Sequence, residues 1–296
     1  MKKIKILSAL MLLTVSFSVC GQDTTQNISR ISIHDVFVQT GFLAERSNNG
    51  SLFDFRVLAP QSHLLYNNLS GFTSPKGFNR NGNSVFSISM GLQFRDKDHE
   101  KYKANPLLRL GISYFSGNNL TASYTREDHT PYDTLTSAHT GDVYYIDSVT
   151  TQYYNMDYSS KQIRFDGSLI FRTKSDARCS LYAGVGISAG LSINTNTNIS
   201  YSKMTRTETE DGSFSGNYDY SNSDITENYI NHPGFGASAD IPMGIDFRLG
   251  KKNEFWKQLH FFYETRPGVS IIVIPEIRTL ANISAQHALG LRVSWN

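Results

Sequence analysis

The chain has little cysteine and few segments that would form a helix, and beyond its N-terminus it has no long apolar run. Its two cysteines are Cys20 and Cys179. Cys20 lies in a segment that we expect to be removed, so no internal disulfide can hold the fold. No later apolar run approaches the ~20 residues of a membrane-spanning helix. The composition, rich in Tyr, Phe, Ser, Asn and Gly, therefore predicts an all-β protein.

The chain also lacks a strong net charge. Its formal net charge is +2, and removal of Lys2, Lys3 and Lys5 with the N-terminal segment changes this to −1. No basic stripe then remains that would attract a phosphate backbone. We therefore expect no nucleic-acid partner.

The N-terminus has the organisation of a secretion signal. The three lysines precede an apolar stretch, residues 6–19, that is too short to cross a bilayer as a helix. Signal peptidase would cut after Gly21, and lipidation of Cys20 is the alternative. Cleavage after Gly21 divides the chain into a signal peptide, 1–21, a short segment, 22–30, and one domain, 31–296.

The last residues of the chain alternate between apolar and polar. In a β-strand successive side chains point to opposite faces, so this segment has one face of each kind. The apolar positions are Leu289, Leu291, Val293 and Trp295, and the polar positions are Gly290, Arg292, Ser294 and Asn296. The pattern recurs in seven earlier windows: 33–45, 85–95, 108–114, 163–172, 181–193, 237–249 and 259–271. Each window meets the ~9–11 residues that a tilted strand needs to cross a membrane, the third only if it extends further.

The charges within these windows all fall in the polar register. A basic side chain facing lipid near the midplane costs ~2–4 kcal/mol, so this pattern indicates a transmembrane barrel with its charges in the lumen. A secreted soluble barrel or sandwich is the alternative. The narrow interior of an eight-stranded barrel and the need to pair buried charges predict a salt-bridged plug. Its candidate members are Arg95, Arg109, Arg164, Asp166, Arg172, Asp240, Asp246, Arg248, Glu264, Arg266 and Arg292, with Asp35 and Glu45 in the same register.

The connections alternate between short and long, as in outer-membrane barrels. The long ones are predicted at 46–82, 127–160 and 202–233, with a shorter one near 272–284. Their tyrosines, among Ser, Thr and Asn, suit contact with an extracellular ligand or protein. The alternative is that these segments are hairpins extending above the bilayer with stacked cross-strand tyrosines. Pro242 suggests a bulge in the sixth strand.

In its strand pattern and loop lengths, the chain resembles the small eight-stranded outer-membrane β-barrel proteins of bacteria, typified by the membrane domain of outer membrane protein A. The resemblance covers residues ~31–296 as pattern and topology. It implies an all-β, antiparallel up-and-down transmembrane barrel in the outer membrane, in contact with outer-membrane lipid. It also implies that the last strand, with Leu289, Leu291, Val293 and Trp295, is the signal read by the barrel-insertion machinery.

Residues for catalysis or metal binding form no convincing set. His34 and His287 both fall in the outward register, but near opposite ends of neighbouring strands. The spacing of Asp128, His129, Asp133 and His139 fits no compact metal site. We therefore expect no cofactor, no metal and no enzyme activity, and we favour a structural or surface-interaction role. A narrow porin-like channel and a membrane-embedded lipid-modifying enzyme are the alternatives, and a count of ten strands stays open.

Overall fold

A computed structural model describes residues 31–46, 48–74, 80–94, 105–136, 138–173, 177–209, 215–219, 224–250 and 253–295. The predicted signal peptide 1–21, the segment 22–30, Arg95 and Asn296 lie outside the described residues. The strands are β1 Ile31–Arg46, β2 Asn48–Asn49, β3 Arg80–Phe94, β4 Leu107–Thr136, β5 Val143–Arg172, β6 Cys179–Thr209, β7 Ser215–Asp219, β8 Ile225–Ile230, β9 Phe235–Asp240, β10 Met243–Arg248, β11 Leu259–Ile274 and β12 Arg278–Ser294. The short helices are α2 Leu52–Leu58, the 3-10 helix η1 Leu64–Tyr66 and α3 Glu254–Gln258. None of the described helices has the length and apolar character needed to cross a bilayer.

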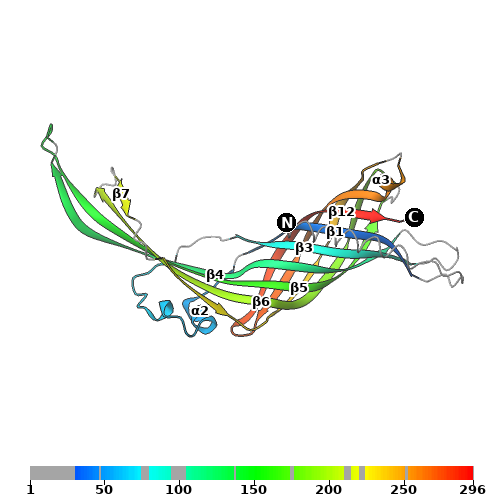
Figure 1. The fold of residues 1–296 in the computed structure, drawn as a ribbon, viewed down its shortest axis with the longest axis horizontal. Helices are drawn as coiled ribbons and strands as arrows, with labels where there is room; N and C mark the ends of the chain where they lie inside the picture. Colours follow the sequence, from blue (N-terminus) through cyan, green and yellow to red (C-terminus); the bar gives the residue numbers. More distant parts are fainter. Residues whose placement is uncertain are drawn as a thin grey trace, which may run out of the picture.

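The main strands close into one antiparallel ring (Figure 1). Its order is β1, β3, β4, β5, β6, then β9 with β10, then β11 and β12, and β12 pairs with β1 to complete the circle. Successive members of the ring are successive in the chain, so the topology is up-and-down. This confirms the predicted eight-stranded antiparallel barrel, in which β9 and β10 together form one position of the ring.

Pro242 separates β9 from β10 without changing the register. Asp240 pairs with Gly268 and Met243 with Thr265, so no residue is inserted between them. The amide of Gly184 still donates to the Pro242 carbonyl at 2.9 Å. The predicted bulge is therefore wrong: the proline interrupts the strand because it lacks an N–H, yet the pairing continues on both sides.

The outer wall of the barrel is apolar, as the alternation predicts. Exposed side chains on it come from every part of the ring, and charges do not interrupt them until the rim at Lys161. They include Phe42, Ile88, Ile112, Phe165, Ile187, Phe247, Phe261, Leu289, Leu291 and Trp295. A closed ring leaves no free strand edge along this wall, which satisfies the backbone polar groups that hydrocarbon could not hydrogen-bond.

Three neighbouring strands continue far past the barrel. β4, β5 and β6 have 30, 30 and 31 residues, whereas β1 and β11 have 16 each. The extensions form the arm at the left of Figure 1, defined here as residues 121–136, 138–160 and 194–209. Most of the predicted loop at 127–160 is therefore strand, in 127–136 and 143–160, and the predicted loop at 202–233 contains strand at 202–209, 215–219 and 225–230. The alternative of extended hairpins is confirmed, but the cross-strand rings of Tyr154 and Tyr201, 4.8 Å apart between centroids, are tilted by 45° and not stacked.

Two further predicted loops are also wrong. β11 continues to Ile274 and β12 begins at Arg278, so the connection near 272–284 shrinks to a turn. The segment predicted as the loop 46–82 contains α2 and η1 and folds back onto the barrel. Ser51 caps α2 by accepting from the amide of Asp54, whose carboxylate accepts in turn from the Ser51 amide. This capping box begins the helix, and Phe55 and Leu58 are its buried apolar residues.

Candidate functional site: a filled lumen, a lid and an arm

The base of the lumen, at the end near the C-terminus, is an ion-pair cluster around Arg292. Its guanidinium contacts Asp35 at 2.9 Å and Asp246 at 2.9 Å. His260 Nδ1 lies 2.6 Å from Asp246 Oδ1, and Arg172 lies 3.9 Å from each of the two carboxylates. All five side chains are buried. Two carboxylates thus hold two guanidiniums and an imidazole from five strands of the ring, and they fill this level of the lumen.

The middle of the lumen is organised by Glu264. This carboxylate is fully buried and accepts from both ends of the Arg109 guanidinium, at 2.8 and 3.1 Å, and from Arg266 Nε at 2.6 Å. Arg109 also donates to Ser168 Oγ at 3.1 Å. The bidentate pair joins β4 to β11 across the interior, where the pairing of buried ions is needed to offset their desolvation.

The remaining predicted lumen residues take other places. Arg164 lies at the outer level, 4.3 Å over the Phe115 ring, and donates to Gln162. Asp166 accepts from Ser113, while Asp240 and Arg248 are half-buried and no ion pair joins either to another described residue. The geometry thus brings Arg109, Arg172, Asp246, Glu264, Arg266 and Arg292 into direct ion pairs and leaves Arg164, Asp166, Asp240 and Arg248 outside them. Arg95 lies outside the described residues.

Sequence reasoning missed the apolar part of the lumen. Phe37, Leu107, Ile170, Tyr182 and Phe262 form a buried cluster between the basal and middle charges. Phe37 and Phe262 meet edge to face at 5.7 Å, and Arg109 lies 5.4 Å from the Phe37 centroid. These residues occupy the same register as the charges, so the lumen is a mixed interior and not a continuous salt-bridge network.

The packing of this cluster predicts a strong position effect for glycine substitutions. A Cβ on Gly290 would lie 2.5 Å from the Phe262 ring, whereas a Cβ on Gly82 would meet nothing within 4 Å. We expect Gly290→Ala to destabilise the barrel by about 1–3 kcal/mol, the usual cost of overpacking. Gly82→Ala should leave stability nearly unchanged. Urea unfolding of both variants in detergent measures the difference, and equal midpoints would contradict the packing.

A lid covers the outer mouth of the lumen. It consists of residues 50–72, and its buried Phe55, Leu58, Leu64 and Leu65 enter one apolar cluster with residues from both sides of the mouth. Those residues are Leu120, Tyr154, Met156, Tyr158, Ile199, Ile272, Ile274 and Leu280. In Figure 1 the helices of the lid lie beside the base of the arm.

Polar contacts fix the lid at its first residue and in its middle. The Gly50 amide donates to the Thr121 carbonyl at 2.9 Å, and Asn231 Nδ2 donates to the Leu58 carbonyl at 2.7 Å. Ser62 donates to Glu227 at 2.5 Å. The segment expected to be a free loop is therefore held in place, although Phe53 and Tyr66 on its outer side are exposed.

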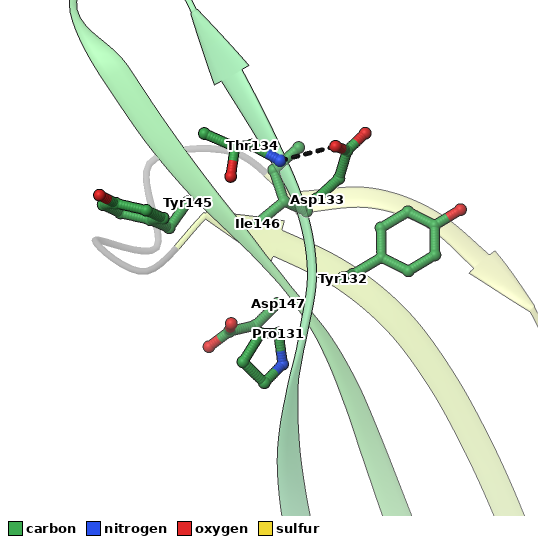
Figure 2. Close-up of a pocket in the computed structure, with 7 residues that line it drawn as sticks. All are labelled: Pro131, Tyr132, Asp133, Thr134, Tyr145, Ile146 and Asp147. Atoms are coloured by element: carbon green, nitrogen blue, oxygen red, sulfur yellow. Dashed lines mark hydrogen bonds between the residues drawn. The ribbon is translucent and has the colours of Figure 1, made fainter.

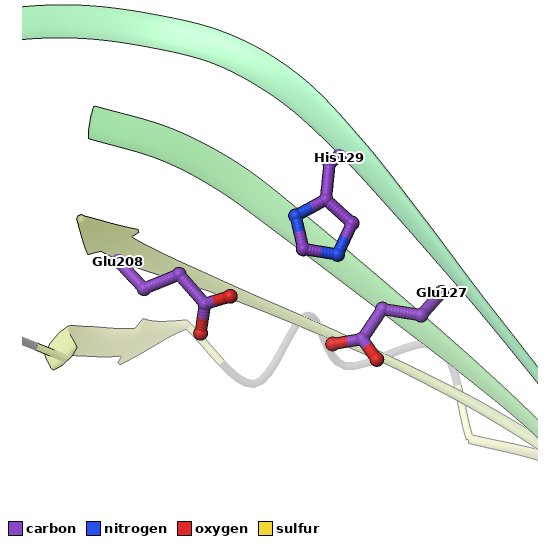
Figure 3. A group of neighbouring side chains, drawn as sticks. All are labelled: Glu127, His129 and Glu208. Atoms are coloured by element: carbon purple, nitrogen blue, oxygen red, sulfur yellow. The ribbon is translucent and has the colours of Figure 1, made fainter. Parts of the chain in front are cut away.

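The arm carries its own ion pairs, and two of them involve carboxylates that belong to a possible metal-ligand group. Glu127, His129 and Glu208 place one ligand atom each within 4.8 Å of one another (Figure 3). Arg206 is already paired with both acids, with Glu127 and, at 2.9 Å, with Glu208. These two pairs raise the pKa of the Arg206 guanidinium. The arginine thus supplies the positive charge that a metal ion would otherwise bring. Of the four residues considered as metal ligands from the sequence, only His129 belongs to this group; Asp128, Asp133 and His139 do not.

The outer end of the arm has a shallow hollow of about 470 Å³ at a bulge (Figure 2). Pro131 pairs with Asp147 and Asp133 with Ile146, so Tyr132 is the extra residue. The hollow is lined by Pro131, Tyr132, Asp133, Thr134, Tyr145, Ile146 and Asp147. The rings of Tyr132 and Tyr145 are 69% and 59% exposed.

The outward histidines do not meet. His34 lies at a bulge of β1 with Nδ1 3.1 Å from Asp35. His287 pairs with Phe42, eight residues further along β1, which is about 26 Å at the rise of a strand. His287 Nδ1 is hydrogen-bonded to Tyr263 at 2.8 Å, and its ring stacks on Phe42 at 5.2 Å. Neither of these partners of His287 is a carboxylate, so no orienting acid accompanies this imidazole among the described residues.

The fold and lumen define a class: a closed eight-stranded antiparallel barrel with an apolar outer wall and a filled interior. No family model matches the sequence, and no curated protein matches it. Among solved structures, the chain is similar to the crystal structure of Neisserial surface protein A (NspA). The sequence identity is 13%, the TM-score is 0.33, and the match covers 90% of this chain and 100% of the other. A likeness at this level carries no conclusion about function.

Proposed function

We propose that this chain is a bacterial outer-membrane protein that acts at the cell surface, with its barrel as the membrane anchor and its arm and lid as the contact surface. One observation carries the proposal: the lumen is filled and lidded, while β4, β5 and β6 extend far beyond the barrel. A barrel used for transport keeps its interior open. In this chain the additional ordered structure, the arm and the lid, lies outside the barrel.

The proposed location is supported by the apolar outer wall and by the inward charges. In this location the proposed partners are outer-membrane lipid, in contact with that wall, and the barrel-insertion machinery, which would recognise the last strand. β12 pairs with β11 along one edge and with β1 along the other, so its insertion closes the ring. Leu289, Leu291 and Trp295 are exposed on its outer face, which supports a role of this strand as the insertion signal.

A test of the proposal combines location with conductance. We expect the protein in the outer-membrane fraction with heat-modifiable migration on gels, since a closed ring resists detergent. In planar bilayers we expect no steady conductance, because side chains fill the narrow interior. Soluble protein in the periplasmic fraction, or stable open-channel currents, would reject the proposal.

A narrow channel is the second candidate. Arg164 Nη1 and Asp240 Oδ1 are buried without a hydrogen-bond partner among the described residues. Unsatisfied polar groups of this kind favour rearrangement, and their movement would open a path for ions. This candidate predicts brief, flickering openings in planar bilayers. Arg164→Gln, which removes the positive charge, should alter their frequency. A lipid-modifying activity has less support, since His34 and His287 lie far apart.

A further inference from the structure

The outer end of the arm has carboxylates without lysine or arginine partners among the described residues. The hairpin tip, residues 131–147, contains Asp133, Asp142 and Asp147 and neither lysine nor arginine. No ion pair joins Asp133 or Asp142 to another side chain in the described part of the chain, and Asp147 has only His129, at 3.7 Å. The tip is therefore an uncompensated acidic surface.

The two arginines lower on the arm do not supply this charge. Arg126 is paired with Asp128 at 2.8 Å, and Arg206 is held by Glu127 and Glu208. Each of these guanidiniums is thus engaged by carboxylates of the arm itself. These arginines therefore leave the carboxylates of the tip open to a cation from another molecule.

The carboxylates of the tip lie beside exposed aromatic rings. Figure 2 shows Tyr145 and Asp147 on one flank of the hairpin and Tyr132 and Asp133 on the other. The bulge at Tyr132 turns its ring outward instead of into a cross-strand pair, unlike Tyr154 and Tyr201 nearer the barrel. The Thr134 amide holds the Asp133 carboxylate by donating at 2.7 Å. Each flank therefore offers one ring face and one carboxylate.

We infer that the hairpin tip is a binding site for the cationic side chains of a basic polypeptide segment. A guanidinium or ammonium group would hydrogen-bond Asp133 or Asp147 and lie against the neighbouring tyrosine ring. Tyrosine with small polar neighbours also gives adaptable contact at low entropic cost. A neutral glycan could pack against the tyrosine rings, but it would not neutralise the negative charge of the three carboxylates. This inference rests on the proposed surface role of the arm and names the chemistry of its partner.

The test uses the full-length protein in vesicles of zwitterionic lipid, with fluorescent hexa-arginine as the probe and hexa-glutamate as the negative probe. We expect saturable binding of hexa-arginine that weakens with salt. The double change Asp133→Asn and Asp147→Asn should raise its Kd at least about tenfold, the loss of roughly one charge-assisted hydrogen bond. Tyr132→Ala should raise the Kd about threefold, while Tyr132→Phe should keep the wild-type value.

The matched control is Asp224→Asn, which removes the same charge from an exposed residue away from the tip, before β8. Its Kd should equal that of the wild type. Equal weakening by Asp224→Asn would mean unspecific attraction and would overturn the inference. Unchanged binding in the double variant, or stronger binding of a neutral oligosaccharide than of hexa-arginine, would also overturn it. Heat-modifiable migration shows that each variant is folded.

The two proposals fail separately. A protein that conducts ions steadily but binds hexa-arginine through Asp133 and Asp147 overturns only the proposed closed surface role. A closed barrel that does not bind the probe overturns only the inference about the tip.

Discussion

Glu264→Ala is expected to lower the stability of the barrel more than any other single replacement of a charge. The carboxylate is fully buried and is the direct ion-pair partner of both Arg109 and Arg266. Its removal deprives two buried guanidiniums of this ion-pair partner, and breaking one buried pair typically costs ~3–5 kcal/mol. Urea unfolding in detergent micelles, followed by tryptophan fluorescence, measures the change.

The control for this prediction separates charge from volume. Glu264→Gln keeps the shape and two hydrogen-bonding groups, so it should lose less stability than Glu264→Ala. Asp224→Ala, at an exposed position, should stay within about 0.5 kcal/mol of the wild type. If Glu264→Ala unfolds at the wild-type midpoint, the pairing across the middle of the lumen is refuted.

Phe55→Ala is expected to release the lid. The Phe55 ring is 0% exposed in the cluster that joins the lid to the barrel mouth, and removing a buried phenyl ring costs ~3–5 kcal/mol. Phe53, two residues away on the same helix, is 73% exposed and is its matched control. Limited proteolysis of intact cells should cut Phe55→Ala within residues 50–72 much faster than wild type or Phe53→Ala.

The lid prediction has a second consequence that distinguishes it from general unfolding. The barrel below the lid keeps its ring pairing and its ion pairs, so Phe55→Ala should retain heat-modifiable migration. It should also stay closed to ions, because the basal and middle levels of the lumen are still filled. Loss of migration together with faster cleavage would mean that lid and barrel unfold as one unit.

The barrel was predictable because its strands alternate between an apolar outer face and a polar inner face. On β6, apolar residues such as Val185 and Ile187 face outward while Gly186 and Ser188 face inward, and the period of two is unmistakable. Within the lumen the same rule located the charges, but not their partners. The contact between Arg109 and Glu264 spans the interior between strands far apart in the chain, and a one-dimensional pattern contains no such information.

The arm could not be found in the same way, because beyond the base that the lid covers water lies on both of its faces. Its strands alternate Thr, Ser, Tyr and Asn, and no apolar register distinguishes them from loops. The run from Val149 to Tyr154, rich in β-branched and aromatic residues, was the available signal. Likewise, Ser51 followed by Asp54 is a capping box, and Leu52, Phe55 and Leu58 have helical spacing. These features were a usable signal for α2, although the segment was predicted as part of the loop 46–82.

The unequal lengths of the ring strands also decide the electrostatic surroundings of the tip. The stretch of β4 from Thr121 to Thr136 has a contour length of about 50 Å at the rise of a strand. Counterions in physiological salt screen a charged surface over about 8 Å. With the barrel in an outer membrane, as proposed, headgroup phosphates would therefore contribute almost nothing to the potential at Asp133 and Asp147. A ligand arriving from outside the cell would then meet these aspartates before it enters the diffuse ion layer of the bilayer.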